Sequence, residues 1–450
     1  MRRRPGNNKK MRAAGLIVLG LSGLCGASLS AEDWPQWRGP SASGVSSERG
    51  LPTRWSDSEN IAWKAPIRGL GISSPIVSGD LVFVTSQAGN GVVRPGPRLV
   101  QGGNPADAGE RALGAGPGSG GGNVVFLVSA YDRGSGRKRW EYELQAEGDL
   151  PPVHEKHNLA SSSPVSDGER VYAWFATGQI AAIDTAGKLV WKKHLGAEYA
   201  PFVINWGHGS SPVVYKGQLI LLCYHEKTSY LLALDARTGA VRWKQDAPAG
   251  VTSYSTPLVV DAGGRIEIVV NSSVGVSGHD FGTGARLWHF DEDNRFPIPT
   301  PVAHDGVIYM SRGYRSSPFM AIRAGGSGNI ADKSVVWRVA SGAPYISSPV
   351  HYDGLLYMTG DVGVLTLSDA KTGERVYQER VGGVYTASPV AADGKVYLLS
   401  EDGETIVLSA GRTPTVLARN RLSARQLASP AIAGGRLFIR ADDALYAIGK

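Results

Sequence analysis

Cysteine is scarce in this sequence, and long apolar runs are missing from it. Its 450 residues include only two cysteines, Cys25 and Cys223, which excludes a disulfide-stapled scaffold and any metal site built from several thiolates. No stretch of 18 or more apolar residues occurs, so we expect no integral membrane span. Charged residues make up 19% of the chain and hydrophobic residues 42%, a balance typical of a globular core rather than a disordered chain.

The net charge of +7 does not indicate a nucleic-acid-binding surface, because the excess lies at the N-terminus. Six Arg and Lys residues there are followed by a short apolar run, residues 13–25, and by small residues at Ser28, Ser30 and Ala31. This layout is typical of a secretory signal peptide. Cleavage near residue 31 removes six of the 47 basic residues and none of the 40 acidic ones, which leaves a net charge of about +1. We therefore expect a periplasmic or secreted protein with no nucleic-acid partner.

Internal repetition runs through the rest of the chain. A Ser-Pro or Thr-Pro pair that opens an apolar run recurs at eight positions, 40–48 residues apart after a first interval of 89. The long first interval contains a Gly- and Pro-rich insertion, residues 87–122. A period of this length indicates an array of similar structural units. The eight prolines are Pro75, Pro164, Pro212, Pro257, Pro301, Pro349, Pro389 and Pro430.

Each unit carries the same series of short strand patterns. A turn rich in Gly, Asp or Lys follows the Pro, and runs of β-branched and aromatic residues follow the turn. A second turn then precedes a Trp, most clearly over residues 231–243. Four short strands in about 40–50 residues predict one blade of a β-propeller. In successive units the Trp position is occupied by Trp140, Trp191, Trp243, Trp288, Trp337, Tyr377 and Leu417.

The two ends of the repeat complement each other. The eighth unit ends at residue 448 after its third strand, whereas residues 61–66 form a fourth strand without a unit and include Trp63. We therefore predict an all-β fold: an eight-bladed β-propeller of four-stranded blades, closed by an N-terminal strand that completes the last blade. The expected organisation is a signal peptide over residues 1–31, an N-terminal extension over 32–60 and the propeller over 61–450.

The units resemble the pyrroloquinoline-quinone-type propeller repeat, through the pattern Ala-x-Asp-x-x-Thr-Gly-x-x-x-Trp at residues 233–243. Quinoprotein dehydrogenases share this repeat with the propeller lipoprotein of the outer-membrane β-barrel assembly machinery. The sequence WPQWRGP at residues 34–40 also resembles the start of a family of exported bacterial propellers. The resemblance covers about residues 34–450. It implies a structural role, between adjacent blades, for Trp63, Trp140, Trp191, Trp243, Trp288, Trp337 and Tyr377.

Strand direction predicts which loops can form a binding site. Because successive strands reverse direction, the linkers that enter each blade lie on the same face as the loops between second and third strands, including the insertion. We call this face the top. Binding residues concentrate on loops held by a rigid scaffold, so the top end of the central channel is the expected site. The candidate residues are His154, His157, Asn205, Trp206, His208, Tyr254, Arg295, Tyr345 and Tyr385.

These residues leave more than one site chemistry open, and we assign no catalytic, cofactor-binding or metal-binding residue. His154, His157 and His208 could converge on a metal, but the motif is short, and we favour solvated or loop-capping histidines. The acidic residues 291–293 could offer oxygen ligands to calcium, although a solvated turn is preferred. Trp206 could either stack on a planar ligand or plug the space between loops.

The resemblance implies two alternative functions. The first is an exported, non-catalytic binding or scaffold propeller, a monomer without cofactor, whose top face engages an envelope protein, peptide or glycan. The second is a quinoprotein dehydrogenase of alcohols or sugars that uses pyrroloquinoline quinone with calcium. We favour the first, because the chain has no adjacent cysteine pair and no Cys-x-x-Cys-His haem motif. An unrelated enzyme that uses the His-containing top loops is a third alternative.

Overall fold

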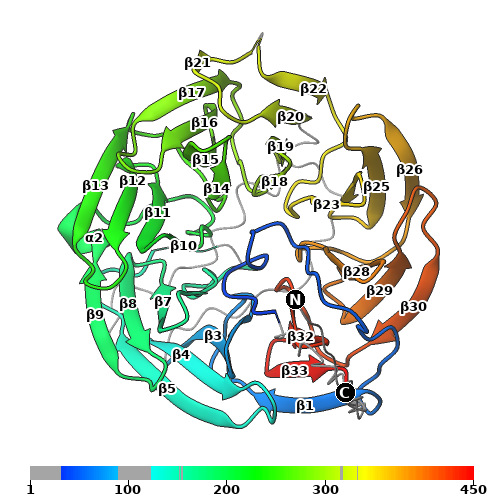
Figure 1. Ribbon diagram of the computed structural model, residues 1–450. Helices are drawn as coiled ribbons and strands as arrows, with labels where there is room; N and C mark the ends of the chain where they lie inside the picture. The colour runs from blue at the N-terminus through cyan, green and yellow to red at the C-terminus, as the bar shows by residue number, and fades with distance from the viewer. Residues whose placement is uncertain (1–31, 90–122, 152, 154–155, 315–317, 332) are drawn as a thin grey trace, which may run out of the picture. The chain divides into compact units, whose positions relative to one another are not determined.

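The described part of the chain folds into a ring of β-sheets (Figure 1). The computed structural model describes residues 32–89, 123–151, 153, 156–314, 318–331 and 333–450. Eight sheets follow one another around the ring, so the predicted eight-bladed β-propeller is confirmed. Among the described residues the only helix is the single turn α2 (Leu195–Glu198), and no helix there is long and apolar enough to cross a membrane.

The first four blades each contain four consecutive strands. Blade 1 consists of β2 (Ile76–Ser78), β3 (Leu81–Ala88), β4 (Val125–Asp132) and β5 (Lys138–Gln145). Blade 2 consists of β6 (Val165–Ser166), β7 (Arg170–Trp174), β8 (Gln179–Asp184) and β9 (Leu189–His194). Blade 3 consists of β10 (Val213–Tyr215), β11 (Gln218–Tyr224), β12 (Ser229–Asp235) and β13 (Val241–Ala247). Blade 4 begins with β14 (Leu258–Asp261), β15 (Ile266–Ser272), β16 (Gly275–Asp280) and β17 (Arg286–Asp291).

The last four blades complete the ring. Blade 5 consists of β18 (Val302–His304), β19 (Val307–Ser311), β20 (Phe319–Arg323) and β22 (Val335–Val339). Blade 6 consists of β23 (Val350–Tyr352), β24 (Leu355–Thr359), β25 (Val364–Asp369) and β26 (Arg375–Arg380). Blade 7 consists of β27 (Val390–Ala392), β28 (Lys395–Leu399), β29 (Glu404–Ser409) and β30 (Val416–Arg421). Blade 8 contains β31 (Ala431–Ala433), β32 (Arg436–Arg440) and β33 (Ala444–Ile448).

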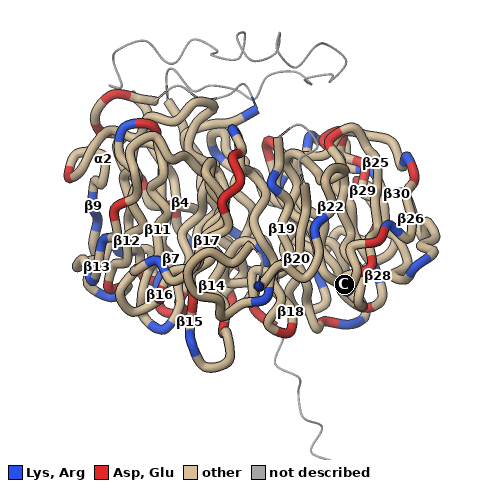
Figure 2. Tube along the Cα trace, turned by 90° about the horizontal axis from the view of Figure 1, so that it is seen from above, with Lys and Arg blue, Asp and Glu red and all other residues tan. Residues whose placement is uncertain are grey.

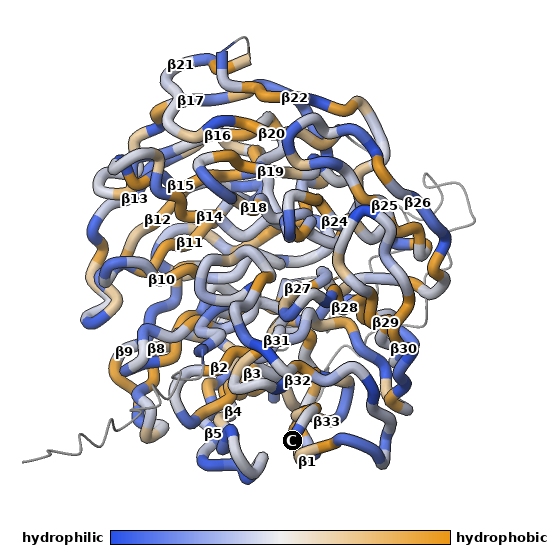
Figure 3. The backbone as a smooth tube through the Cα atoms, turned by 45° about the vertical axis from the view of Figure 1, so that its right-hand side comes forward, coloured by the Kyte–Doolittle hydropathy of each residue, from blue (hydrophilic) through white to orange (hydrophobic). Residues whose placement is uncertain are grey.

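Strand position within a blade determines the residue pattern. The second and third strands are covered on both faces by neighbouring blades, so β11, with the sequence QLILLCY, is buried along its whole length. The fourth strands lie at the outside and consist mostly of exposed and partly buried residues, which alternate in β22. Figure 3 shows the hydrophobic residues concentrated along the strands, and Figure 2 shows basic and acidic residues interspersed along the described chain.

The N-terminal strand β1 (Ile61–Pro66) completes blade 8, as predicted. It pairs antiparallel with β33, from Ile61 opposite Ile448 to Pro66 opposite Ala444, and gives the strand order β1-β33-β32-β31. Figure 1 shows the blue strand β1 beside the red strand β33. This pairing removes the free edge that β33 would otherwise present.

Blade 4 has a fifth strand that the sequence did not reveal. The two-residue strand β21 (Gly328–Asn329), which lies between β20 and β22 in the chain, pairs in parallel with β17 of the preceding blade. A pair of residues that includes glycine carries no strand pattern, so periodicity alone could not identify it.

The hydroxyl residue before each repeat proline joins neighbouring blades. The backbone N–H of Ser74 in blade 1 donates to the Oγ of Ser163 in blade 2 at 2.9 Å, and the same bond recurs at each following interface as far as blade 8. These bonds, at 2.9–3.0 Å, satisfy buried amides that no strand partner reaches. The further links run from Ser163 to Ser211, Ser211 to Thr256, Thr256 to Thr300, Thr300 to Ser348, Ser348 to Ser388 and Ser388 to Ser429.

Five of the seven predicted docking residues contact the following blade in the same way. The indole N–H of Trp191 donates to the carbonyl of Ala236 at 3.0 Å, and its ring covers Gly239, where a Cβ would lie 2.8 Å from the ring. Gly239 also has a φ of +73°, a left-handed backbone conformation that residues with a Cβ adopt poorly. The equivalent donors are Trp63, Trp140, Trp243 and Trp337, at 2.9–3.1 Å from carbonyls of the next blade.

Trp288 and Tyr377 depart from this arrangement. Trp288 is fully buried and donates at 2.8 Å to the carboxylate of Glu267 in its own blade. Strand β21 belongs to the connection between β20 and β22 of blade 5 and pairs with Trp288 itself, so this longer connection accounts for the difference. The hydroxyl of Tyr377 instead bonds Glu379 on its own strand.

The N-terminal extension lies against the face opposite the top. Trp34 pairs with Val77 of blade 1, and Val45 pairs with Ala391 of blade 7. Between them the buried guanidinium of Arg38 donates at 2.6 Å to the carbonyl of Pro349 in blade 6. Figure 1 shows this dark-blue segment across the centre of the ring. It therefore covers the centre of the ring on this face.

The predicted insertion falls between β3 and β4, as expected from the repeat. Strand β3 continues to Ala88, past the predicted start of the insertion at residue 87, whereas β4 begins at Val125, after its predicted end at residue 122. Most of the insertion, residues 90–122, lies outside the described residues, as does the predicted signal peptide.

Candidate functional site

Several predicted top-face residues come together around two aromatic side chains that the sequence analysis had not selected. The ring centroids of Trp206 and Tyr254 each lie 6.1 Å from that of Phe296. The Phe296 ring lies 4.9 Å from Tyr314, which in turn lies 5.5 Å from Tyr345. We call these five residues the aromatic cluster. Four of them lie in the linkers that enter blades 3–6, and Tyr314 follows β19, the second strand of blade 5.

Phe296 and Tyr314 could have been found by the same reasoning. Phe296 lies in the linker that enters blade 5, and Tyr314 follows β19, so strand direction places both on the top. The exposed guanidinium of Arg295 lies 5.1 Å from the centroid of the Phe296 ring, which adds a positive charge to the cluster.

Trp206 has a backbone conformation that is unusual for a bulky residue. Its φ is +79°, and Gly207 follows with a φ of +92°. Two bonds to Asn205 hold this turn: its N–H donates to Glu226 at 2.8 Å, and its carbonyl accepts from the hydroxyl of Tyr254. Strained conformations persist only where surrounding contacts fix them, and they occur preferentially at functional sites. The strained turn therefore favours a functional role for Trp206 among the residues of the cluster.

The candidate histidines are not arranged as a metal site in the described residues. His208 is 2% exposed, with its ring 4.2 Å from Trp174 and 5.4 Å from Phe202. Burial, together with nearby His225 and His157, lowers the pKa of His208 to about 3, so its imidazole is neutral. No group of three or more His, Cys, Asp or Glu side chains among the described residues is placed to hold a metal. His154 lies outside those residues.

Tyr385 occupies the same linker position as Tyr345 but lies in the core. It is 1% exposed and belongs to the apolar cluster between blades 6 and 7, where burial raises the pKa of its phenol. It does not offer its ring to a partner on the top face. His208 is buried in the equivalent way between blades 2 and 3.

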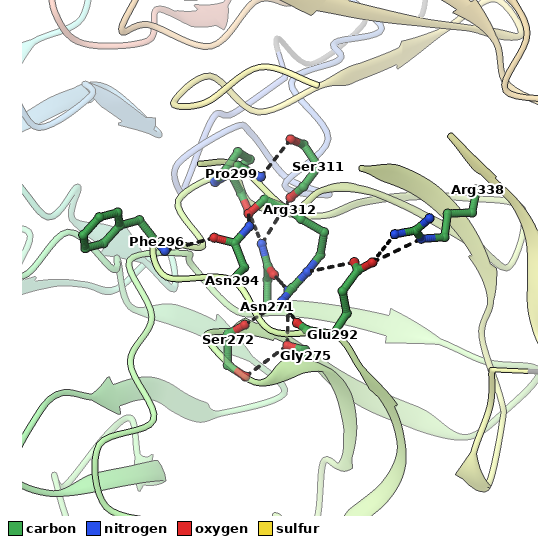
Figure 4. A network of polar contacts seen from close by, with 11 residues as sticks. Asn271, Ser272, Gly275, Glu292, Asn294, Phe296, Pro299, Ser311, Arg312 and Arg338 are labelled. Atoms are coloured by element: carbon green, nitrogen blue, oxygen red, sulfur yellow. Dashed lines mark hydrogen bonds and ion pairs between the residues drawn. The ribbon is translucent and has the colours of Figure 1, made fainter. Parts of the chain in front are cut away.

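Within the acidic run 291–293, Glu292 serves as a counter-ion for two arginines. Glu292 bonds Arg338 and lies 3.5 Å from the Nε of Arg312, whose side chain is fully buried (Figure 4). Arg312 also donates at 2.9 Å to the carbonyl of Ser272. Burial lowers the pKa of Arg312 to about 10, an effect opposed by Glu292 and Asp293.

This arrangement does not fit the calcium that the dehydrogenase alternative requires. Asp291 contacts His289 at 2.8 Å, and Glu292 lies between two guanidinium groups. A cation at Glu292 would have to compete with both guanidinium groups for the same carboxylate. The side chains present are therefore arranged for internal ion pairs rather than for a set of oxygen ligands converging on calcium.

Similarity to known proteins covers most of the chain. A family model described as outer membrane protein assembly factor BamB matches residues 125–328 and 326–413. Tetrathionate hydrolase of Acidithiobacillus ferrooxidans is 26% identical over 359 residues, which cover 75% of this chain and 64% of that protein. The BamB of Yersinia pestis is 22% identical over 318 residues, which cover 70% of this chain and 66% of that protein. The matches thus span less than two thirds of either relative.

A solved structure shares the fold. Quinohemoprotein alcohol dehydrogenase from Comamonas testosteroni superposes with a TM-score of 0.62 over 93% of this chain and 81% of that chain. Its sequence identity is 14%, so this likeness shows the propeller fold alone.

Proposed function

This chain belongs to the family of outer membrane protein assembly factor BamB, and from that membership we propose that it is a binding or assembly propeller of the cell envelope. It acts as a monomer in the periplasm, or outside the cell, after its signal peptide has been removed. Its partner is an envelope protein, peptide or glycan, and it requires neither cofactor nor metal.

The aromatic cluster is the observation that supports a top-face binding site. Aromatic side chains and Arg contribute most to binding energy at protein interfaces, and Arg295 lies beside Phe296. The strained turn at Trp206 fixes the ring at one edge of the cluster before any partner arrives. Among the described residues, the N-terminal extension covers the centre of the opposite face, which favours the top as the binding face.

Site-specific crosslinking tests this proposal. A photo-reactive phenylalanine analogue placed at Tyr345 should crosslink to one defined partner in intact cells. The same analogue at Tyr199, an exposed aromatic residue outside the cluster, serves as the control and should not. Adding Trp206→Ala should reduce the Tyr345 crosslink at least tenfold while the thermal unfolding midpoint stays above growth temperature. Equal crosslinking from positions 199 and 345 would place the binding surface elsewhere.

Activity assays test the enzymatic alternatives. With pyrroloquinoline quinone and calcium added, the purified chain should give no alcohol- or sugar-dependent dye reduction. Turnover that Trp206→Ala abolishes would establish the dehydrogenase instead. Because tetrathionate hydrolase is among the relatives, hydrolysis of tetrathionate should also be measured, and turnover there would likewise replace the binding proposal.

A further inference from the structure

The outer edges of the blades differ in whether another strand covers them. Each fourth strand bonds the third strand of its blade on one side, which leaves its other side at the edge of the sheet. In blade 4 this edge is covered, because β21 pairs in parallel with β17 through Trp288 opposite Gly328 and His289 opposite Asn329. The chain itself therefore demonstrates that an outer strand of this ring accepts a fifth strand.

Strand β22 in the next blade has the edge least protected against such pairing. Its sequence is VVWRV, with one charged residue and no proline. Charges and prolines on an edge strand prevent pairing with other chains. Strands β5, β9, β13, β26 and β30 each carry two or more charged residues, and β1 ends in Pro66. Among the open outer strands, β22 therefore stands alone in lacking this protection.

The only charged side chain of β22, that of Arg338, already forms an ion pair. The Nε of Arg338 donates to the carboxylate of Glu292 at 3.1 Å, and Figure 4 shows this ion pair beside the Arg312 network. Val336, by contrast, is 41% exposed. Among the described residues, the backbone of β22 hydrogen-bonds only to β20. The strand thus presents an apolar side chain and unpaired backbone groups together.

We propose that the edge of β22 is a docking site for an extended, uncharged segment of a partner protein, which adds to blade 5 as a further strand. Backbone hydrogen bonds provide the affinity in this mode of recognition, and alternating side chains provide selectivity. The segment occupies on blade 5 the position that β21 occupies on blade 4. This surface is separate from the aromatic cluster and stands independently of the top-face proposal.

A short peptide of defined sequence tests the edge directly. The probe is a fluorescent, end-blocked peptide of alternating Thr and Val, and binding to the full chain is measured by anisotropy. Val336→Lys adds a charge to the edge and should weaken binding at least tenfold. The matched control Val416→Lys changes an equally exposed valine (49%) on the outer strand of blade 7 and should leave binding unchanged. Trp206→Ala should also leave it unchanged.

Two further comparisons make the outcome decisive. A peptide methylated on alternate backbone nitrogens keeps its side chains but loses hydrogen-bond donors, so it should not bind. Binding of the methylated peptide, an equal loss in both lysine variants, or no binding by the wild-type chain would each overturn the proposal. A dimer in light scattering that only Val336→Lys dissociates would also overturn it, because the edge would then pair with a second copy of the chain.

Discussion

The backbone amide of Ser348 in blade 6 donates a 2.9 Å hydrogen bond to the hydroxyl of Ser388 in blade 7. Ser388 in turn donates its own amide to the hydroxyl of Ser429 in blade 8. The six hydroxyl residues between Ser74 and Ser429 in this series therefore each accept from one blade while their amides donate to the next. This arrangement explains why Ser or Thr precedes the proline of the repeat, a preference that the sequence alone did not explain.

Removing one hydroxyl from this series should destabilise the ring. Ser388→Ala leaves the buried amide of Ser348 without its acceptor, which should cost about 1–3 kcal/mol of unfolding free energy. Ser388→Thr keeps the acceptor and should cost less, since blades 4 and 5 use Thr256 and Thr300 at this position. Urea unfolding measures both. Alanine and threonine variants of equal stability would contradict the proposed role of the hydroxyl.

A pair of glycine variants separates steric contact from backbone strain. Gly373 has a φ of +74°, and a Cβ there would lie 2.5 Å from the ring of Trp337. Gly354 has a φ of +72° and no atom within 4 Å of the same position. Gly354→Ala should therefore cost about 1–2 kcal/mol from strain alone, whereas Gly373→Ala should cost about 1–3 kcal/mol more from overpacking. Chemical denaturation of both variants gives this difference directly, and similar losses would rule out the packing contribution.

Ring closure predicts a large effect at Trp63. This side chain is 8% exposed and its indole N–H donates to Arg133 of blade 1 at 3.0 Å. Trp63→Ala should cost about 3–5 kcal/mol, because both the packing and the bond are lost. Lys64→Ala, on the same strand but exposed, should cost much less. Calorimetry can compare the two, and an unchanged melting temperature for Trp63→Ala would show that the closing strand contributes little stability.

Acid should loosen the interface between blades 5 and 6. The rings of His304 and His351 stack with centroids 4.2 Å apart, and Tyr309 lies 5.2 Å from His351. Burial, and then His304, lowers the pKa of His351 to about 4, with Asp305 opposing this shift. The folded state therefore binds fewer protons than the unfolded one, for which the pKa is about 6.5. Stability should fall as the pH drops from about 6.5 to about 4.

Replacing His351 with a ring that cannot be protonated tests this origin. His351→Phe keeps an aromatic ring beside Tyr309 and should flatten the decrease in unfolding free energy over that pH range. The measurement is a series of urea titrations at fixed ionic strength. Identical slopes for the two proteins would assign the acid sensitivity to other buried groups, such as His208 or His279.

The sequence predicted the ring because its repeat is strict. Eight proline positions and the unpaired strand around Trp63 together determined both the number of blades and the closing strand. Trp288 does not make the interblade contact predicted for it, because the strand formed by Gly328 and Asn329 lies beside it. Two residues are too few to give a periodic signal. Periodicity thus identifies repeated contacts, and it misses a contact that occurs once.

The site was only partly predictable, because linker position does not determine burial. Tyr345 and Tyr385 precede their prolines by the same number of residues, yet Tyr345 joins the aromatic cluster and Tyr385 enters the core. His208 at the equivalent position is enclosed by Trp174 and Phe202. Contacts between blades, which linker position does not encode, therefore determine whether each side chain is buried.

The closing strand also determines when the protein can finish folding. Ile61 pairs with Ile448, so a strand that is synthesised early must wait for residues 444–448 before it can pair. Pairings this distant in sequence form slowly and expose unpaired edges in the meantime. A chain interrupted before residue 444 would leave β1 and the end of the array open together. The β1–β33 pairing therefore acts as a completeness check, since the two ends of the blade array are covered only once β33 has been made.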